Sequence, residues 1–318
     1  MGTFRHFFGL DQKDSPELLP AIERAVSGVE PLLMQTRKYP EAYRKAVMTA
    51  LEYTHNLAFS IPGPVAVNLD SYAKDAFVHA IFPSMDLVSE AFRASRAMQD
   101  YLHNHPATDE AYALMGMRRF EKTMMGMQLS GEVIQRDVPQ KIIYFTDHTI
   151  VDPAPSEQQA RKQMAWEFFD SLVDKVAKRV ALRKQEMQAQ LQEMDLLKAR
   201  LHSANAETRP AMEKEFSSML ASLQTATRSL DLHNYPEDFE AVLLDPEAHL
   251  RLNQSPMILD SMGIRQNSDE AEPGEQIIFN DLIGFDRRDW TVTMVYCQNI
   301  QSETFAARLE TAYRKLSI

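Results

Sequence analysis

Asp147 and His148 are the adjacent residues of this chain best suited to acid–base chemistry. They stand at the end of an apolar segment that reads as a strand, where the carboxylate could orient the imidazole as a general base. The sequence assigns no nucleophile beside them, and Asp and His at a strand end often make only turn hydrogen bonds. A hydrolase-type enzyme using these two residues is therefore one hypothesis, although the balance favours a protein that is not an enzyme.

Metal and cofactor chemistry has little support in the sequence. His103 and His105 could bind a metal, but no cysteine or nearby acidic cluster supplies the remaining ligands. Both residues stand where a helix ends before Pro106, and a cationic imidazole interacts favourably with the helix dipole there. The P-loop, nucleophile-elbow, zinc-protease and calcium-loop motifs are absent. We therefore expect no cofactor and no bound metal.

A basic stripe lies along one long predicted helix. It could bind phosphates, which makes a nucleic-acid-associated protein the second hypothesis. The net charge of −11 and the acidic character of residues 205–318 argue against a general affinity for nucleic acid. We expect the stripe to pair instead with acidic residues of this chain or of a protein partner. Its members are Lys175, Lys178, Arg179, Arg183 and Lys184.

The elements that carry these residues are organised around residues 156–232, which are predicted to form an inserted coiled-coil helical hairpin. An apolar residue returns at every seventh position of the first helix. After a polar break at Ser203–Pro210, apolar residues alternate at spacings of four and three. The second helix is about half as long, so the proximal half of the first needs another partner. The two seams are Val173, Val180, Met187, Met194 and Leu201, and Met212, Phe216, Met219, Leu223, Ala226 and Leu230.

Residues 1–129 are predicted to form an N-terminal helical domain resembling a bundle. Capping residues start its helices, and prolines separate them with short connections. The last helix is expected over Thr108–Gln128, where a run of methionines at helical spacing would fill the core. The Phe-rich segment at residues 1–14 is expected to pack on this domain rather than to anchor it in a membrane.

Residues 130–155 and 233–318 are predicted to build one antiparallel β-sheet domain. Residues with high β propensity dominate Glu132–Val138 and Lys141–Val151, and Pro139-Gln140 is a plausible turn between them. A two-stranded unit alone is only marginally stable, so we join it to the strands predicted after the hairpin. An amphipathic helix is expected over Gln301–Leu316. The fold class is thus α+β and mostly helical.

Composition limits where and how such a chain works. The single Cys297 excludes an intrachain disulfide and suits a reducing compartment, and no apolar run approaches the ~18 residues of a membrane span. We expect a cytoplasmic protein. The favoured function is a scaffold or adaptor for protein–protein interaction, in which the seams of the helical arm either bind another protein or self-associate in a homodimer.

Overall fold

The structure, a computed structural model, describes residues 16–108, 110–130, 133–205, 208–229, 231–260, 262–266, 274–286 and 288–298. The Phe-rich N-terminal segment, Leu230 and the helix expected over Gln301–Leu316 lie outside these ranges. Long helices accompany an antiparallel sheet, so the predicted α+β, mostly helical class is confirmed.

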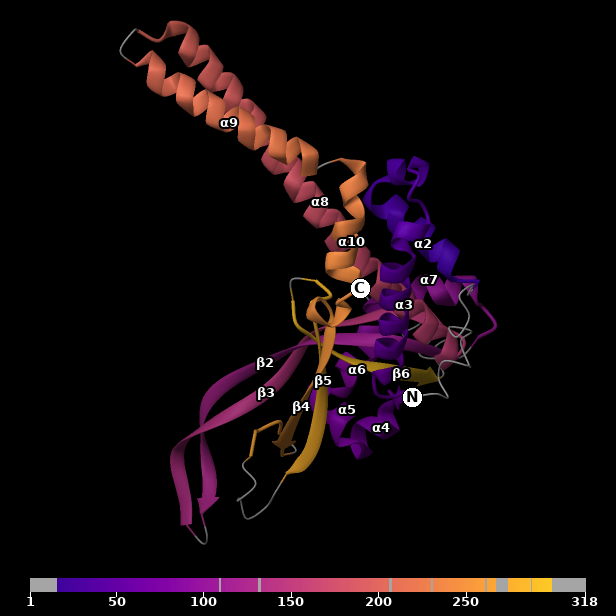
Figure 1. Cartoon of the computed structure of the whole chain (residues 1–318). Coiled ribbons are helices and arrows are strands. Elements are labelled where there is room, and N and C mark those ends of the chain that lie inside the picture. Colours follow the sequence, from indigo (N-terminus) through magenta and orange to yellow (C-terminus); the bar gives the residue numbers. More distant parts are fainter. Residues whose placement is uncertain are drawn as a thin grey trace, which may run out of the picture. The chain divides into compact units, whose positions relative to one another are not determined.

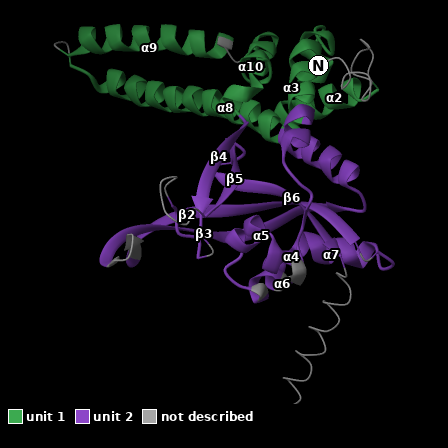
Figure 2. Cartoon of the chain, turned by 90° about the horizontal axis from the view of Figure 1, so that it is seen from below, with its two compact units in different colours: residues 1–54, 169–249 green, residues 55–168, 250–318 purple. Residues whose placement is uncertain are grey.

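The chain divides into two compact units (Figure 2). Unit 1 comprises residues 1–54 and 169–249, and unit 2 comprises residues 55–168 and 250–318. Helices α3 (Glu41–Ser60) and α8 (Glu157–Ser203) each contribute residues to both units.

Unit 1 is helical, and its other helices pack against the part of α8 that the shorter α9 does not cover. The side chain of Tyr43 on α3 meets the ring of Phe239 on α10 edge-on, with ring centroids 4.8 Å apart. Burial raises the pKa of Tyr43 to about 12. A Cβ atom at Gly28 on α2 would stand 3.2 Å from Cγ1 of Val173, so the missing side chain lets α2 approach α8 closely. Besides parts of α3 and α8, unit 1 contains α2 (Leu18–Val29), α9 (Arg209–Ser229), α10 (Tyr235–Leu243) and the 3-10 helices Pro31–Gln35, Leu232–Asn234 and Pro246–Ala248.

Unit 2 contains a curled antiparallel sheet with the strand order β3-β2-β6-β5-β4, and the short β1 pairs with β6 in parallel. The segment that follows β4 forms hydrogen bonds with β3, and so connects the two ends of this sheet. The Ile143 N–H of β3 donates to the Gly263 carbonyl at 2.9 Å, and the Arg265 N–H donates to the Lys141 carbonyl at 2.8 Å. The strands are β1 (Val65–Ala66), β2 (Glu110–Ser130), β3 (Val133–Ala154), β4 (Arg251–Leu259), β5 (Glu275–Ile283) and β6 (Trp290–Gln298).

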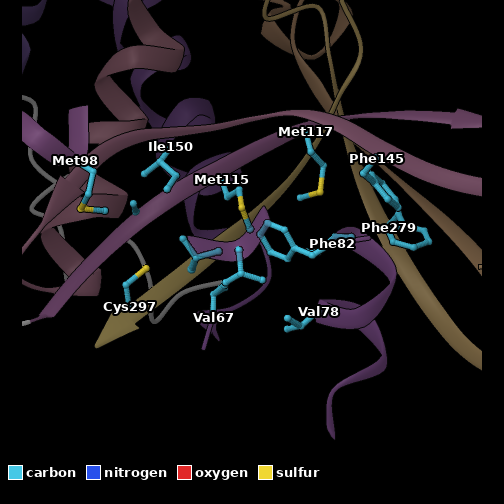
Figure 3. Packing of buried hydrophobic residues seen from close by; sticks show 14 of the residues in the cluster. Val67, Val78, Phe82, Met98, Met115, Met117, Phe145, Ile150, Phe279 and Cys297 are labelled. Carbon is cyan, nitrogen blue, oxygen red and sulfur yellow. The ribbon is translucent and has the colours of Figure 1, made fainter. Parts of the chain in front are cut away.

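Short helices cover one face of the sheet and enclose the core of unit 2 (Figure 3). Alternate residues of β2, such as Met115 and Met117, point into this core beside Phe145 and Phe279. Phe82 and Met98 enter it from the helical side. The helices are α4 (Leu69–Lys74), α5 (Ala76–Ile81), α6 (Met85–Ala94) and α7 (Arg96–Asn104).

The helix expected over Thr108–Gln128 is wrong, because this segment is strand β2. Over its first half β2 lies between β3 and β6, and both of its faces are covered there, so buried residues follow one another without alternation from Ala113 to Met117. Methionine, alanine and leucine also favour helices, and sheet pairing overrides that local preference. The predicted domain boundary at residue 129 therefore falls within the β2–β3 pair.

The turn expected at Pro139-Gln140 is also wrong, because β3 continues through it and Pro139 pairs with Met125. At this point β3 has a strand on one side only among the described residues, and a proline is tolerated where its missing N–H would face outwards. The connection between β2 and β3 instead falls between Ser130 and Val133.

Candidate functional site

The predicted helical arm is present in unit 1, where α9 runs back beside the distal half of α8 (Figures 1 and 2). The Thr227 hydroxyl lies 4.0 Å from the Met187 sulfur, which fixes the antiparallel register of the two helices. Partly or fully buried residues recur along both helices at alternating spacings of three and four. The two helices therefore contact each other along one face of each.

The seam of the arm is closed at some positions and partly open at others. Val173, Val180 and Leu223 are buried, and so is Leu197 nearer the tip. The remaining described seam residues are only partly covered, because two helices alone cannot enclose a core. These are Met187, Met194, Leu201, Met212, Phe216, Met219 and Ala226.

One flank of the arm carries two leucines beside the partly exposed seam residues. Leu191 of α8 lies one turn after Met187, and Leu220 of α9 directly follows Met219; the two leucines remain 37 % and 40 % exposed. The contact between Met187 and Thr227 sets the register of the two antiparallel helices. In this register Leu191, four residues after Met187, lies beside Leu223 of α9, which is about one turn from Leu220. We call the surface around Leu191 and Leu220 the leucine flank. An apolar stripe widened in this way is typical of a helix that packs in a bundle.

The opposite flank of the arm is different. A cavity of about 470 Å³ lies there between the helices, bordered by the charged residues Glu193, Lys214 and Glu215. Its floor includes Gln190, whose buried Oε1 has no hydrogen-bond partner among the described residues. This flank is polar at its rim.

The members of the basic stripe all have partners within unit 1. Lys175 donates to the His249 carbonyl at 2.8 Å, and Lys178 pairs with Asp174 one turn away. The Arg179 and Arg183 side chains both pair with Asp238 of α10, at 3.1 Å for Arg179, and Lys184 donates to Glu30 at 2.8 Å. Apart from the Lys178–Asp174 pair, which lies within α8, these contacts join α8 to its neighbours in unit 1.

The pKa shifts in the stripe follow from these contacts. Burial lowers the pKa of Lys175. The hydrogen bond between Lys184 and Glu30 lowers the pKa of the Glu30 carboxyl and raises the pKa of the Lys184 amine. Cations in such pairs are less available to phosphate, and nothing in the described part of the stripe favours the nucleic-acid hypothesis.

Asp147 and His148 lie at a β-bulge within β3 rather than at a strand end. The pairing of β2 with β3 shifts between Gly116 and Arg118, and Asp147 adopts a φ of 55° at this shift. Asp tolerates the left-handed conformation better than most residues, which accounts for its place in the bulge. The sequence pattern could not reveal this irregularity, because the strand continues on both sides of it.

At this bulge the side chains of Asp147 and His148 have different partners. The Asp147 carboxylate lies 3.5 Å from Arg118, whereas Nε2 of His148 lies 2.8 Å from the Ile81 carbonyl. Because a carbonyl only accepts, Nε2 carries the proton. The His148 ring also stacks on Phe82, with centroids 4.7 Å apart. No hydrogen bond joins Asp147 to His148 in the described structure, so the arrangement needed for a carboxylate-oriented base is not formed.

His148 gives a pH-dependent prediction. Burial lowers its pKa below the ordinary 6.5, so the unfolded chain binds the proton first as the pH falls. Stability from neutral His148 is present above pH 6.5 and is lost as the pH decreases through the folded pKa. We expect His148→Gln, which keeps a donor for the Ile81 carbonyl, to reduce the slope of unfolding free energy against pH by up to about 1.4 kcal/mol per unit.

Urea titrations between pH 7.5 and 5.5, followed by tryptophan fluorescence, measure this slope for both proteins. Parallel pH dependences for the wild type and His148→Gln would rule out a neutral, buried His148 as the cause.

His103 and His105 do not form a metal site in this structure. The Nδ1 atom of His105 lies 3.0 Å from the Tyr101 carbonyl near the end of α7, and its ring stacks on Tyr101. Among residues whose placement is described, no group of three or more His, Cys, Asp and Glu side chains could hold a metal ion. Within the same ranges, no helix is both long enough and apolar enough to cross a membrane.

Comparisons with protein-family models, curated proteins and solved structures found no match for this chain.

Proposed function

We propose that this protein acts through protein–protein interaction, and that the leucine flank of the α8–α9 arm is the surface that binds a second copy of the chain. The single observation that carries the proposal is the incomplete seam, in which most apolar residues beyond the base of the arm stay partly exposed and continue onto the flank through Leu191 and Leu220. Covering them with two more helices would complete a four-helix core.

The charge pattern of the arm supports a protein partner. The helix α9 has no charged residue from Phe216 to Thr227. A helix surrounded by water on most sides usually carries charges on its outer face. This stretch of α9 without charges favours contact with another protein.

The flank is also complementary to itself. If two arms lie side by side about a two-fold axis along their length, α8 of each copy faces α9 of the other. Leu191 then lies opposite Leu220 of the second copy. Lys198 and Glu213, seven residues further towards the tip on each helix, then face each other with opposite charges. These pairings favour a second copy of this chain as the partner.

The mass of the full chain in solution tests the proposal. We expect sedimentation velocity at micromolar concentrations to give about twice the chain mass of 36.4 kDa. Replacing both flank leucines, Leu191→Glu with Leu220→Glu, would bury charges in the interface and weaken the dimer roughly 30-fold or more, which corresponds to about 2 kcal/mol.

Leu196→Glu is the matched control, because Leu196 is 62 % exposed on the same helix but lies away from the flank. It should leave the dimer unchanged. A wild-type mass of 36.4 kDa at every concentration, or equal weakening by the control and the flank variant, would contradict the proposal.

A further inference from the structure

Strand β5 of unit 2 has an open edge. It pairs with β4 from Glu275 to Ile283, but with β6 only through Asp281 and Leu282. Further along, β6 pairs with β1 instead. Within the described residues, Glu275–Asn280 therefore have a strand partner on one side only. In an antiparallel strand every second residue directs its N–H and C=O to each side, so half of these residues present theirs to the open edge.

A cavity of about 830 Å³ borders this open edge. It lies between the beginning of β5, the β1 segment and the helices α4 and α5. Its size is within the range of sites that enclose a ligand. Its apolar lining includes Val65, Phe77, Ile277 and Ile278, and Lys74 and Glu275 place one charge of each sign beside them.

The side chains at the cavity suit a peptide in extended conformation. Successive residues of β5 point to opposite faces, so Ile277 is buried towards the helices while Ile278 remains 49 % exposed on the other face. The Phe77 ring lies 5.8 Å from the Phe279 ring and presents an apolar wall on the helical side. A strand added here would find apolar contacts at alternate side chains on either face.

We propose that this cavity binds an extended peptide segment of another protein, which adds to the open edge of β5 as a further strand. Main-chain hydrogen bonds to β5 would provide affinity, and apolar side chains at alternate positions would contact Phe77 and Ile278. The unpaired backbone of β5 selects this occupant, because a small apolar molecule could not satisfy a row of N–H and C=O groups. The site is separate from the leucine flank, and the proposal does not depend on self-association.

Backbone methylation tests this proposal on the full chain. The probe is a fluorescent synthetic peptide with the alternating sequence Thr-Val-Thr-Ile-Thr-Val, titrated by fluorescence anisotropy. Two methylated forms of it carry N-methyl groups on the odd or on the even residues, with the same side chains. A strand edge uses only one of these sets of N–H groups. We expect one methylated form to bind as the parent peptide does and the other at least roughly tenfold more weakly.

Protein variants locate the binding. Ile278→Lys should weaken binding of the parent peptide by about tenfold or more, because it places a charge against the added strand. Met262→Lys is the matched control, an exposed apolar residue outside the cavity, and should bind as the wild type does. Circular dichroism checks that both variants are folded. No binding at millimolar peptide, equal binding of the two methylated forms, or equal binding by the two variants would overturn the proposal.

Discussion

Replacing Asp238 by alanine is expected to lower the free energy of unfolding of unit 1 by about 3–5 kcal/mol. The Asp238 side chain is 4 % exposed and accepts from the guanidinium groups of Arg179 and Arg183 on α8. Arg179 is largely exposed and contributes little, whereas Arg183 is three-quarters buried. Without the carboxylate, the charge of Arg183 would lose its main compensation.

Far-UV circular dichroism during urea unfolding measures this effect, because unit 1 is helical. Asp174→Ala is the control, since it breaks the exposed pair with Lys178 on the same helix and should cost no more than about 0.5 kcal/mol. If Asp238→Ala proved as stable as Asp174→Ala, the pairing of α8 with α10 would not have the importance that we assign to it.

Replacing Arg161 by methionine should destabilise unit 2 by about 3–5 kcal/mol. Arg161 is 6 % exposed at the beginning of α8, and Nη1 donates to the carbonyls of Ala58 and Ile61 at 2.8 and 2.9 Å. Nη2 donates to the Gly63 carbonyl at 3.2 Å, and Nε donates to Glu157 at 2.7 Å. The guanidinium group thus satisfies carbonyls at the end of α3 that would otherwise be buried without donors.

Tryptophan fluorescence during urea unfolding follows this change, because Trp166 and Trp290 both belong to unit 2. Lys162→Met, an exposed neighbour, serves as the control and should stay within about 0.5 kcal/mol of the wild type. Arg161→Lys keeps the charge but not the planar fork, so an intermediate loss is expected. Equal stability of Arg161→Met and Lys162→Met would exclude this capping role.

The regular spacing of apolar residues along the chain was sufficient to predict the two helices of the arm, but not the strands of the sheet. A seven-residue repeat depends only on neighbours along one helix, and the antiparallel α8–α9 pair follows directly from it. Strand β2 has no comparable local signal. Its identity comes from pairing with β3 and with β6, and the β6 residues lie far from it in the sequence.

The same limit applies to the buried charges and to the candidate sites. Arg161 and its acceptor Ala58 are 103 residues apart, and Arg183 and Asp238 are 55 apart, so no motif connects them. The sequence does reveal the charges of the basic stripe. In the structure four of its members pair with carboxylates of this chain, and Lys175 donates to a main-chain carbonyl. The edge of β5 is open because β6 stops pairing with β5 after two residues and pairs with β1 further along. The alternation of apolar and polar residues in the two strands does not predict where this pairing ends.

The distance between two arm tips tests the central proposal most directly. Ser203 is exposed at the end of α8, and Cys297 is buried, so a spin label on Ser203→Cys reports on the tip of the arm. For arms packed side by side through the leucine flank, pulsed electron double resonance should give a label-to-label distance of about 20–35 Å, two to three helix diameters. Absence of any dipolar modulation, or a distance beyond about 60 Å, would contradict the proposed dimer.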